Sequence, residues 1–450
     1  MLDSPFLNAV SLFVVQNYDV LPTALLGGIL AAAAAWVVLI SKSLSSHFRT
    51  PSIQSAGRKN PVRPKRDWLA LRRLRTIPLP LVSVIVPARN EEESIRECLI
   101  SILLQRDANF EVIAIDDNST DRTLAIMREL EAQTQFSGKL RVLSIDTKPD
   151  GWTGKTWASQ QGYLHSRGKV LLFMDADGHL DNPEAIRLTL EAMLSENLDV
   201  LTGVPFLPLR DFWSKIVMPV WNLYSEVSGR GIADANDPGS KVAFVMGSYF
   251  MIRKRAFESV GTYARVKDEI QEDASMGRLL KQGGYRIKMF KIDSLVTALW
   301  SRDLATLWSG IRRTVIPIAM RQKRAPLLQQ FAMIGMIIFP FLLWPFSAIH
   351  GLAASGGTHQ PAGVWSALFI ADSALCLAVI ITTAVKGIWK YRQSPAYSLL
   401  CAMGALFLVV CAAYSVAPII FGKGAKPVSW RGRPHTFPPQ GQGEPEAAPA

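Results

Sequence analysis

Two acidic residues directly after an apolar run could bind a metal ion. Asp175 and Asp177 follow the run 170–174. Alternate residues of an extended segment point the same way, so these two carboxylates can share one face. Hard oxygen ligands of this kind suit Mg²⁺ or Mn²⁺, with a diphosphate completing the coordination shell. Taken alone the pair could be a solvated turn, but two further acidic clusters in the chain favour a metal site.

The second acidic cluster, 116–121 (DDNSTD), follows the apolar run 110–115. A carboxylate at such a position can accept a hydrogen bond from a nucleobase N–H or a ribose hydroxyl. The same segment is typical of a turn whose last residues cap the next helix. The two interpretations are compatible, because different side chains would carry them.

Three further segments could supply a base, a close backbone approach and a cation. Residues 269–273 (EIQED) precede a helix-like run, so their acids either stabilise the N-terminus of that helix or include a general base for an acceptor hydroxyl. Gly247 permits close approach of the backbone to a ligand. Lys155, in the segment 152–156 (WTGKT), could neutralise a phosphate, although this segment lacks the first glycine of a phosphate loop.

Strand-like and helix-like segments alternate between residues 80 and 284, which predicts an α/β domain with a mostly parallel sheet and helices on both faces. Ligands of such sheets bind outside the carboxyl ends of the strands, so clusters that follow different strands are expected at one rim. The expected strands are 81–86, 110–115, 140–145 and 170–174, and the expected helices are 92–105, 123–133, 157–165 and 274–282.

Apolar runs on both sides of this domain predict membrane helices. Of the 450 residues 49% are hydrophobic and 19% charged, which excludes disorder as the main state and is too apolar for an ordinary soluble protein. Four cysteines without a CxxC pair exclude a disulfide scaffold and a zinc ribbon. Runs with few or no charges predict four spans, near 20–41, 327–350, 361–385 and 397–422.

The net charge of +12 is concentrated in two patches beside these runs. Residues 42–75 carry ten Lys or Arg against one Asp, and residues 302–324 carry six against one, so the patches contribute +9 and +5. Positive charge beside an apolar run marks the cytoplasmic side of a membrane, where it also meets anionic lipid. We therefore expect an integral membrane protein whose residues 42–324 face the cytoplasm, and no nucleic-acid partner.

The chain is expected to consist of seven parts. Simple alternation of the spans puts the tail outside, whereas its Lys and Arg favour the inside, so its side stays open. Asp372 falls inside a span, either as a functional carboxylate or at a water-filled or headgroup-level position. The parts are an N-terminal segment 1–19, a membrane helix 20–41, a basic linker 42–79, a catalytic domain 80–300, a basic interfacial segment 301–326, a membrane domain 327–422 of about three spans, and a tail 423–450 that is disordered after 434.

The clusters, in this order, resemble family 2 glycosyltransferases of the GT-A fold. The family's P-x-x-N-E segment matches 87–91 (PARNE), its D-D-x-S-x-D motif matches 116–121, its DxD motif matches 175–177, and its E-D motif matches 272–273. The segments 151–155 (GWTGK) and 429–433 (SWRGR) look like a membrane-bound subgroup that glycosylates lipids, which includes carotenoid, hopanoid-associated and ceramide glucosyltransferases.

The resemblance implies transfer of one sugar from a nucleotide-diphospho-sugar, of the UDP-hexose type, to a hydroxyl of a membrane lipid at the bilayer, with inversion. It also implies that Asp273, beside Glu272, is the catalytic base and that Asp177, with Asp175, binds Mg²⁺ or Mn²⁺. Residues implied at the nucleotide-sugar are Pro87, Asn90, Glu91, Asp117, Lys155, Asp175 and Gly247.

One departure from the family pattern bears on the product. Polysaccharide synthases of the family carry Q-x-x-R-W after the E-D motif, whereas this chain has 307–313 (LWSGIRR), in which Trp308, Arg312 or Arg313 would act near the acceptor or the diphosphate. This difference favours single transfer over a processive polysaccharide synthase, which is the alternative enzyme. A non-catalytic membrane-anchored binding protein is the remaining alternative, but such a relative should have lost an acid from one cluster, and none is missing.

Overall fold

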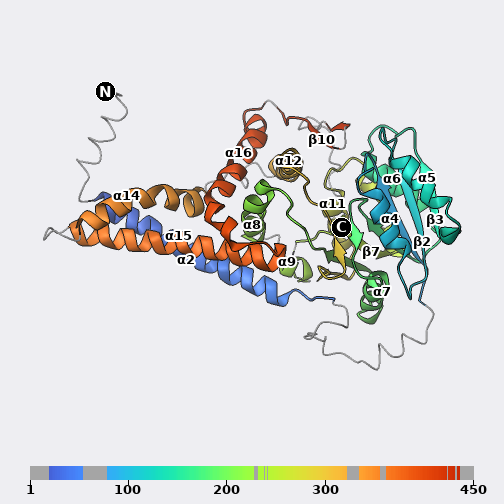
Figure 1. The fold of residues 1–450 in the computed structure, drawn as a ribbon, viewed down its shortest axis with the longest axis horizontal. Coiled ribbons are helices and arrows are strands. Elements are labelled where there is room, and N and C mark those ends of the chain that lie inside the picture. Colours follow the sequence, from blue (N-terminus) through green and yellow to red (C-terminus); the bar gives the residue numbers. More distant parts are fainter. Residues whose placement is uncertain are drawn as a thin grey trace. The chain divides into compact units, whose positions relative to one another are not determined.

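The computed structural model describes residues 20–53, 79–227, 232–237, 239–240, 242–321, 334–354, 361–422, 424–430 and 433–435. The chain divides into two compact units (Figure 1). One comprises residues 1–44, 209–228 and 318–425, and the other comprises residues 45–208, 229–317 and 426–450. The expected N-terminal segment 1–19, the linker from 54 to 78, the end of the interfacial segment from 322 and the tail beyond 435 lie outside the described residues.

A seven-stranded sheet of order β3-β2-β1-β4-β7-β6-β8 forms the centre of the second unit. The pairs from β3 to β4 are parallel, as is the pair of β6 and β8, whereas β7 is antiparallel to both of its neighbours. The predicted α/β class with a mostly parallel sheet is therefore confirmed. The strands are β1 Val82–Ala88, β2 Phe110–Asp116, β3 Leu140–Ser144, β4 Val170–Met174, β6 Val200–Val204, β7 Tyr249–Arg253 and β8 Ile287–Lys291.

The composition of the central strands explains why they form there. Strands β2 (FEVIAID) and β4 (VLLFM) are buried at every residue. A strand between two parallel neighbours, with helices on both faces, meets no solvent, so β-branched and other apolar residues follow one another without alternation. This is why the apolar runs of the sequence located these strands to within two residues.

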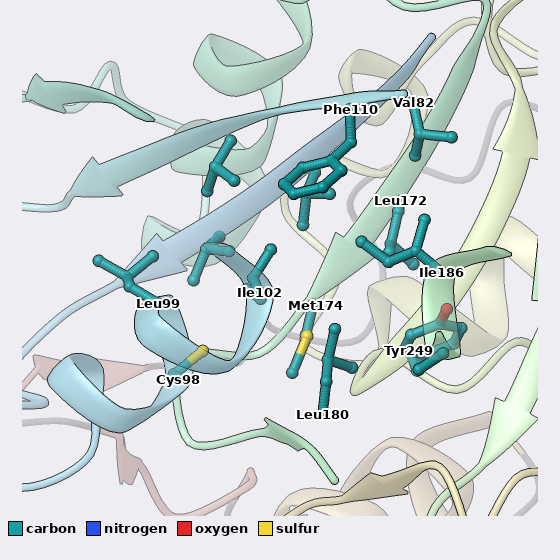
Figure 2. Packing of buried hydrophobic residues seen from close by; sticks show 14 of the residues in the cluster. Val82, Cys98, Leu99, Ile102, Phe110, Leu172, Met174, Leu180, Ile186 and Tyr249 are labelled. Carbon is teal, nitrogen blue, oxygen red and sulfur yellow. The ribbon is translucent and has the colours of Figure 1, made fainter. Parts of the chain in front are cut away.

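Helices cover both faces of the sheet. Successive residues of β1 point to opposite faces, so that Val84 joins one buried cluster and Ile85 the other. Figure 2 shows the first cluster, in which Leu99 and Ile102 of α4 pack with Leu172 and Met174 of β4. The helices of that face are α4 Ile95–Leu103, α5 Thr123–Glu131 and α7 Ala185–Ser195, and those of the other are α6 Gly154–Leu164, α10 Lys254–Ser259 and α11 Glu272–Gln282.

Shorter elements complete this unit. They are η1 Thr134–Phe136, β5 His179–Leu180, α9 Ile232–Asn236, η2 Tyr263–Val266, β9 Val296–Thr297, the helix α12 Leu304–Arg321, whose last residues extend past this unit, and the hairpin strands β10 Val428–Trp430 and β11 Arg433–His435. The hairpin is antiparallel, with Trp430 opposite Arg433. Residues from the end of the sequence thus form part of the unit that contains the sheet.

The first unit is helical, and four helices of the described chain are long and apolar enough to cross a membrane: Leu21–Arg49, Gly335–Ala353, Gly363–Tyr391 and Pro395–Ile420. Asp372 is fully buried there and accepts a hydrogen bond from Ser347 at 3.0 Å. The unit also contains α8, although this helix falls within the span 80–300. Its elements are α2 Leu21–Arg49, α8 Phe212–Val227, η3 Ile334–Ile338, α14 Phe339–Ala354, α15 Pro361–Tyr391, η4 Pro395–Leu400 and α16 Cys401–Ile420.

Candidate active site

The turns that follow β1 and β2 are bonded to each other at the carboxyl rim of the sheet. Asn90 and Asn118 have φ of 52° and 53°, a left-handed conformation that asparagine tolerates better than most residues. The side-chain oxygen of Asn90 accepts from the amide of Thr120 at 2.8 Å, and the amide of Asn90 donates to Ser119 Oγ at 3.0 Å. Asn90, predicted to contact the nucleoside, therefore also fixes the turn that carries the second acidic cluster.

Glu91, another predicted nucleoside contact, is buried and bonded within the protein. Its Oε2 accepts from Arg302 Nη2 at 2.6 Å and from Ser94 Oγ at 2.7 Å. Arg302 also donates to Glu93 at 3.0 Å. Pro87 lies in β1 beside Ile115 of β2 and is partly exposed. Contacts of these residues to a nucleoside stay predictions.

Lys155 brings together the predicted metal motif and the predicted base motif. Its Nζ lies 2.7 Å from Asp175 Oδ1 and 2.9 Å from Glu272 Oε1. The amide of Gly247 donates to Asp273 Oδ2 at 3.4 Å. A Cβ at Gly247 would lie 3.0 Å from Lys155 Nζ, so this position admits no larger residue without displacing the lysine. Five predicted site residues, which come from separate parts of the sequence, therefore meet in one cluster.

Helix α11 places both acids of the base motif in its first turn. Burial raises the pKa of Asp273 to about 6, and the charge of Glu272 acts in the same direction, while Lys155 and the amides of Ala274 and Gly247 act against it. Burial alone would lower the pKa of Lys155, but Asp175 and Glu272 outweigh it and raise that pKa well above its usual value. Lys155 is therefore charged, and Asp273 has the near-neutral pKa that suits a general base.

Asp177 lies near Asp175 and Glu91 around a buried cysteine. Burial raises the pKa of the Cys98 thiol, and the charges of Asp177, Glu91 and Asp175 raise it further. The thiol lies 3.8 Å from the backbone oxygen of Asp175. No group of three or more His, Cys, Asp or Glu able to hold a metal occurs in the described part of the chain. The two DxD carboxylates are suitable hard ligands, but an ion on them would need oxygens from a ligand such as a diphosphate.

Asp117 is buried and paired with an arginine from the end of the chain. Its side chain is 4% exposed, and its Oδ2 accepts from Arg433 Nη1 at 2.5 Å. Burial raises the pKa of Asp117, while Arg433 and Arg89 lower it. A Cβ at Gly154 would lie 2.3 Å from Asp117 Oδ2 and 2.7 Å from Arg433 Nη1. Only glycine fits there without moving this pair, and Gly154 immediately precedes Lys155.

Helix α12 carries the three residues predicted near the acceptor or diphosphate. Arg312 Nη2 donates to the backbone oxygen of Pro427 at 3.2 Å, next to the start of β10. Gln271, which precedes the base motif, donates to the backbone oxygen of Thr314 at 3.4 Å. The helix therefore contacts both the base segment and the segment that leads to Arg433. The roles of Trp308, Arg312 and Arg313 stay predictions.

Three residues of this region were not predicted as site residues. The sequence predicts membrane-edge charge for the basic residues of 302–324, whereas in the structure Arg302 pairs with Glu91. Arg433 belongs to the motif 429–433 and to the basic residues of the tail, and Gly154 belongs to the motif 151–155. For Arg433 and Gly154, membership of these motifs is the sequence signal that could have identified them. The contact between residues 117 and 433 leaves no local sequence pattern, because the two residues are far apart in the chain.

Comparison with known proteins identifies the family. The family model described as Glycosyl transferase family 2 matches residues 83–261. A 4,4'-diaponeurosporenoate glycosyltransferase of Staphylococcus haemolyticus is 37% identical over 354 residues, which cover 69% of this chain and 88% of the relative. The chain is a family 2 glycosyltransferase. The expected family and enzyme class are thereby confirmed.

More distant relatives of this glycosyltransferase match over shorter stretches or at lower identity. The probable glycosyltransferase YdaM of Bacillus subtilis is 28% identical over 217 residues, about half of each chain (47% and 49%). A mannosyltransferase of Pyrobaculum calidifontis, solved with GDP-Man and Mn²⁺, is 18% identical and covers 81% of this chain and 99% of its own, with a TM-score of 0.47. The family assignment rests on the sequence relatives, because a TM-score below 0.5 reflects only a distant likeness.

Proposed function

We propose that this glycosyltransferase transfers one sugar from a nucleotide-diphospho-sugar, of the UDP-hexose type, to a hydroxyl of a membrane lipid, with inversion at the anomeric carbon. One observation carries the proposal: Lys155 forms ion pairs with both Asp175 and Glu272. A donor diphosphate at the DxD motif would then lie within a few ångströms of the base motif, as in-line transfer requires.

The described residues suggest a role for each group. Asp117 and the segment 87–91 hold the nucleoside, and Lys155 places a positive charge beside the diphosphate. Asp273 takes the proton from the acceptor hydroxyl, whose oxygen forms a bond to the anomeric carbon while the bond from that carbon to the diphosphate oxygen breaks. The nucleoside diphosphate leaves with the electron pair, and no covalent enzyme intermediate forms. Glu272 assists by raising the pKa of Asp273.

The DxD carboxylates fit a divalent cation, Mg²⁺ or Mn²⁺, held by Asp177 with Asp175. When bound together with the donor, the cation would neutralise charge that develops on the leaving diphosphate. Lys155 already pairs with Asp175 at 2.7 Å, so the lysine would either keep this position beside the cation or turn toward the diphosphate.

The acceptor is proposed from the relative and from the apolar helices. The Staphylococcus haemolyticus relative is named for a carotenoid substrate, 4,4'-diaponeurosporenoate. Four helices among the described residues are long and apolar enough to cross a bilayer, which favours an acceptor that is itself dissolved in the membrane. The basic residues of 42–75 and 302–324 favour the cytoplasmic side of the membrane for the catalytic unit.

A carboxylate group of the acceptor is a second candidate for the attacking oxygen, and the name of the Staphylococcus haemolyticus relative favours it. The substrate 4,4'-diaponeurosporenoate is by its ending a carboxylate, and a carboxylate is already ionised at neutral pH. Attack by such an oxygen would need no base, and a charged Asp273 nearby would oppose binding of the acceptor. The raised pKa of Asp273 favours a hydroxyl as the first candidate, because deprotonation of a hydroxyl requires a general base whose pKa lies near neutral pH.

The test uses membranes that contain the full chain and radiolabelled UDP-glucose, UDP-galactose, UDP-GlcNAc and GDP-mannose in separate reactions. Lipids are extracted and analysed by mass spectrometry, and membranes with Asp273→Asn serve as the control. We expect one sugar per lipid from a UDP-sugar. A ladder of products would assign a polysaccharide synthase, and label from GDP-mannose alone would refute the UDP donor.

A further inference from the structure

The two carboxylate oxygens of Asp117 have different surroundings. Oδ2 accepts from Arg433, whereas Oδ1 is buried and has no hydrogen-bond partner in the described part of the chain. An unpaired acceptor in a side chain that is 4% exposed loses its water without compensation. A donor N–H or O–H of a bound ligand that reached this oxygen would offset that cost.

The charge of Asp117 depends on three groups. Arg433 from β11 and Arg89 from the end of β1 lower its pKa, while Asp116 of β2 raises it, and burial raises it most. Arg89 reaches the backbone of Asp117 and Asn118, where it donates to the two carbonyl oxygens at 2.5 and 2.6 Å. Arg433 Nη1 bonds the carboxylate itself, at Oδ2.

Several contacts within the catalytic unit hold Arg433 in its position. Hairpin strand β11 pairs with β10, and the segment before β10 is held by Arg312 through the backbone oxygen of Pro427. Gly154, at the start of α6, leaves the space in which the guanidinium meets Asp117. The next residue, Lys155, belongs to the cluster around the DxD motif. Arg433 thus lies beside Asp117, which is proposed to contact the nucleoside, and beside Gly154, which precedes the Lys155 proposed at the diphosphate.

We infer that Arg433 is a positioning residue for the donor nucleotide: by holding Oδ2 of Asp117 it keeps the carboxylate ionised and directs Oδ1 toward a donor N–H or O–H of the nucleoside. The inference rests on the proposed function, because it assumes a nucleoside diphosphate at this rim. It adds a residue from the end of the chain to the donor site.

The experiment measures binding of UDP, as the probe, to the purified full chain in lipid nanodiscs by calorimetry, and donor KM and kcat in the transfer assay. Arg433→Ala should weaken UDP binding and raise the donor KM by about tenfold, the factor for one lost charge-assisted hydrogen bond, while kcat changes little. Arg433→Lys should restore part of the affinity. Arg141→Ala, which removes an exposed arginine of β3, is the matched control and should leave binding unchanged.

Two readouts separate positioning from a merely structural role. Without Arg433 the pKa of Asp117 rises further, so the loss of UDP affinity in Arg433→Ala should be greater at pH 6 than at pH 8. In an Asp117→Asn background, Arg433→Ala should have no additional effect, because the carboxylate it serves is gone. Thermal melting of each variant checks folding, and if Arg433→Ala fails to fold, Arg433→Gln, which also removes the positive charge, takes its place in the comparison.

The outcomes are distinct. Equal UDP affinity of Arg433→Ala and wild type would overturn the inference and leave the proposed function intact, provided that Asp117→Asn still weakens binding. Tighter binding by Arg433→Ala would also overturn it, because the arginine would then compete with the nucleotide. A folded wild-type chain that binds no nucleoside diphosphate would refute the proposed function itself.

Discussion

Replacement of Lys155 by methionine tests whether this lysine sets the charge of the base. The variant keeps a side chain of similar length and removes the cation that pairs with Asp175 and Glu272. Burial and Glu272 already raise the pKa of Asp273, and the lysine opposes them. Without it, Asp273 should bind its proton more tightly, so the enzyme should need a higher pH to become active.

The size of the effect follows from the geometry. A Cβ at Gly247 would lie 3.0 Å from Lys155 Nζ and 3.5 Å from Asp273 Oδ2, so these two atoms are at most about 6.5 Å apart. At an effective dielectric constant of about 20, two unit charges at that distance interact by about 2.5 kcal/mol. Residual exposure of the lysine, 19%, reduces this energy somewhat. The acidic limb of the rate profile should therefore move up by about one to two pH units.

The assay is kcat/KM for the donor from pH 5 to 9, because this ratio reports ionisations of the free enzyme. Wild-type activity should fall as the pH drops through about 6, where Asp273 becomes protonated. Lys155→Met should show this fall at higher pH and recover activity in alkali, and Lys169→Met, at an exposed position, should follow the wild type. If Lys155→Met is active and the acidic limb of its pH–rate profile lies where that of the wild type does, Lys155 does not set the pKa of Asp273.

Four further changes test separate parts of the site. Asp273→Asn should lower kcat for a hydroxyl acceptor by about 10²–10⁴ with UDP affinity retained, and should do far less if the acceptor is a carboxylate. Asp177→Ala should lose about 100-fold or more in activity and all stimulation by Mg²⁺ or Mn²⁺, unlike Asp150→Ala. Gly154→Ala should weaken UDP binding in calorimetry, because its Cβ would lie 2.3 Å from Asp117 Oδ2. Gly277→Ala should lower Tm by about 5 °C, since its Cβ would lie 2.4 Å from the Phe244 Cα.

The sequence was sufficient to place the acids because their position depends on local rules. Asp116, Asp117 and Asp175 lie at or directly after the ends of β2 and β4, and parallel strands bring such ends to one edge of the sheet. Buried strands are continuous apolar runs, so their ends are visible in the sequence. The meeting of Lys155 with Asp175 follows from the same rule, because α6 begins at that edge as well.

Other features depend on partners that the sequence does not reveal. Strand β7 (YFMIR) is as apolar as its neighbours, and nothing in its composition distinguishes an antiparallel strand between β4 and β6 from another parallel one. The contact of Arg433 with Asp117 is equally hidden in the sequence, because 316 positions separate the two residues. An arginine in a polar tail is typical of a solvated residue, whereas here it supplies the counter-charge of a buried carboxylate. For an acid predicted at the end of a buried strand, a cation is therefore expected elsewhere in the chain, and a search for it should include basic residues of a polar tail.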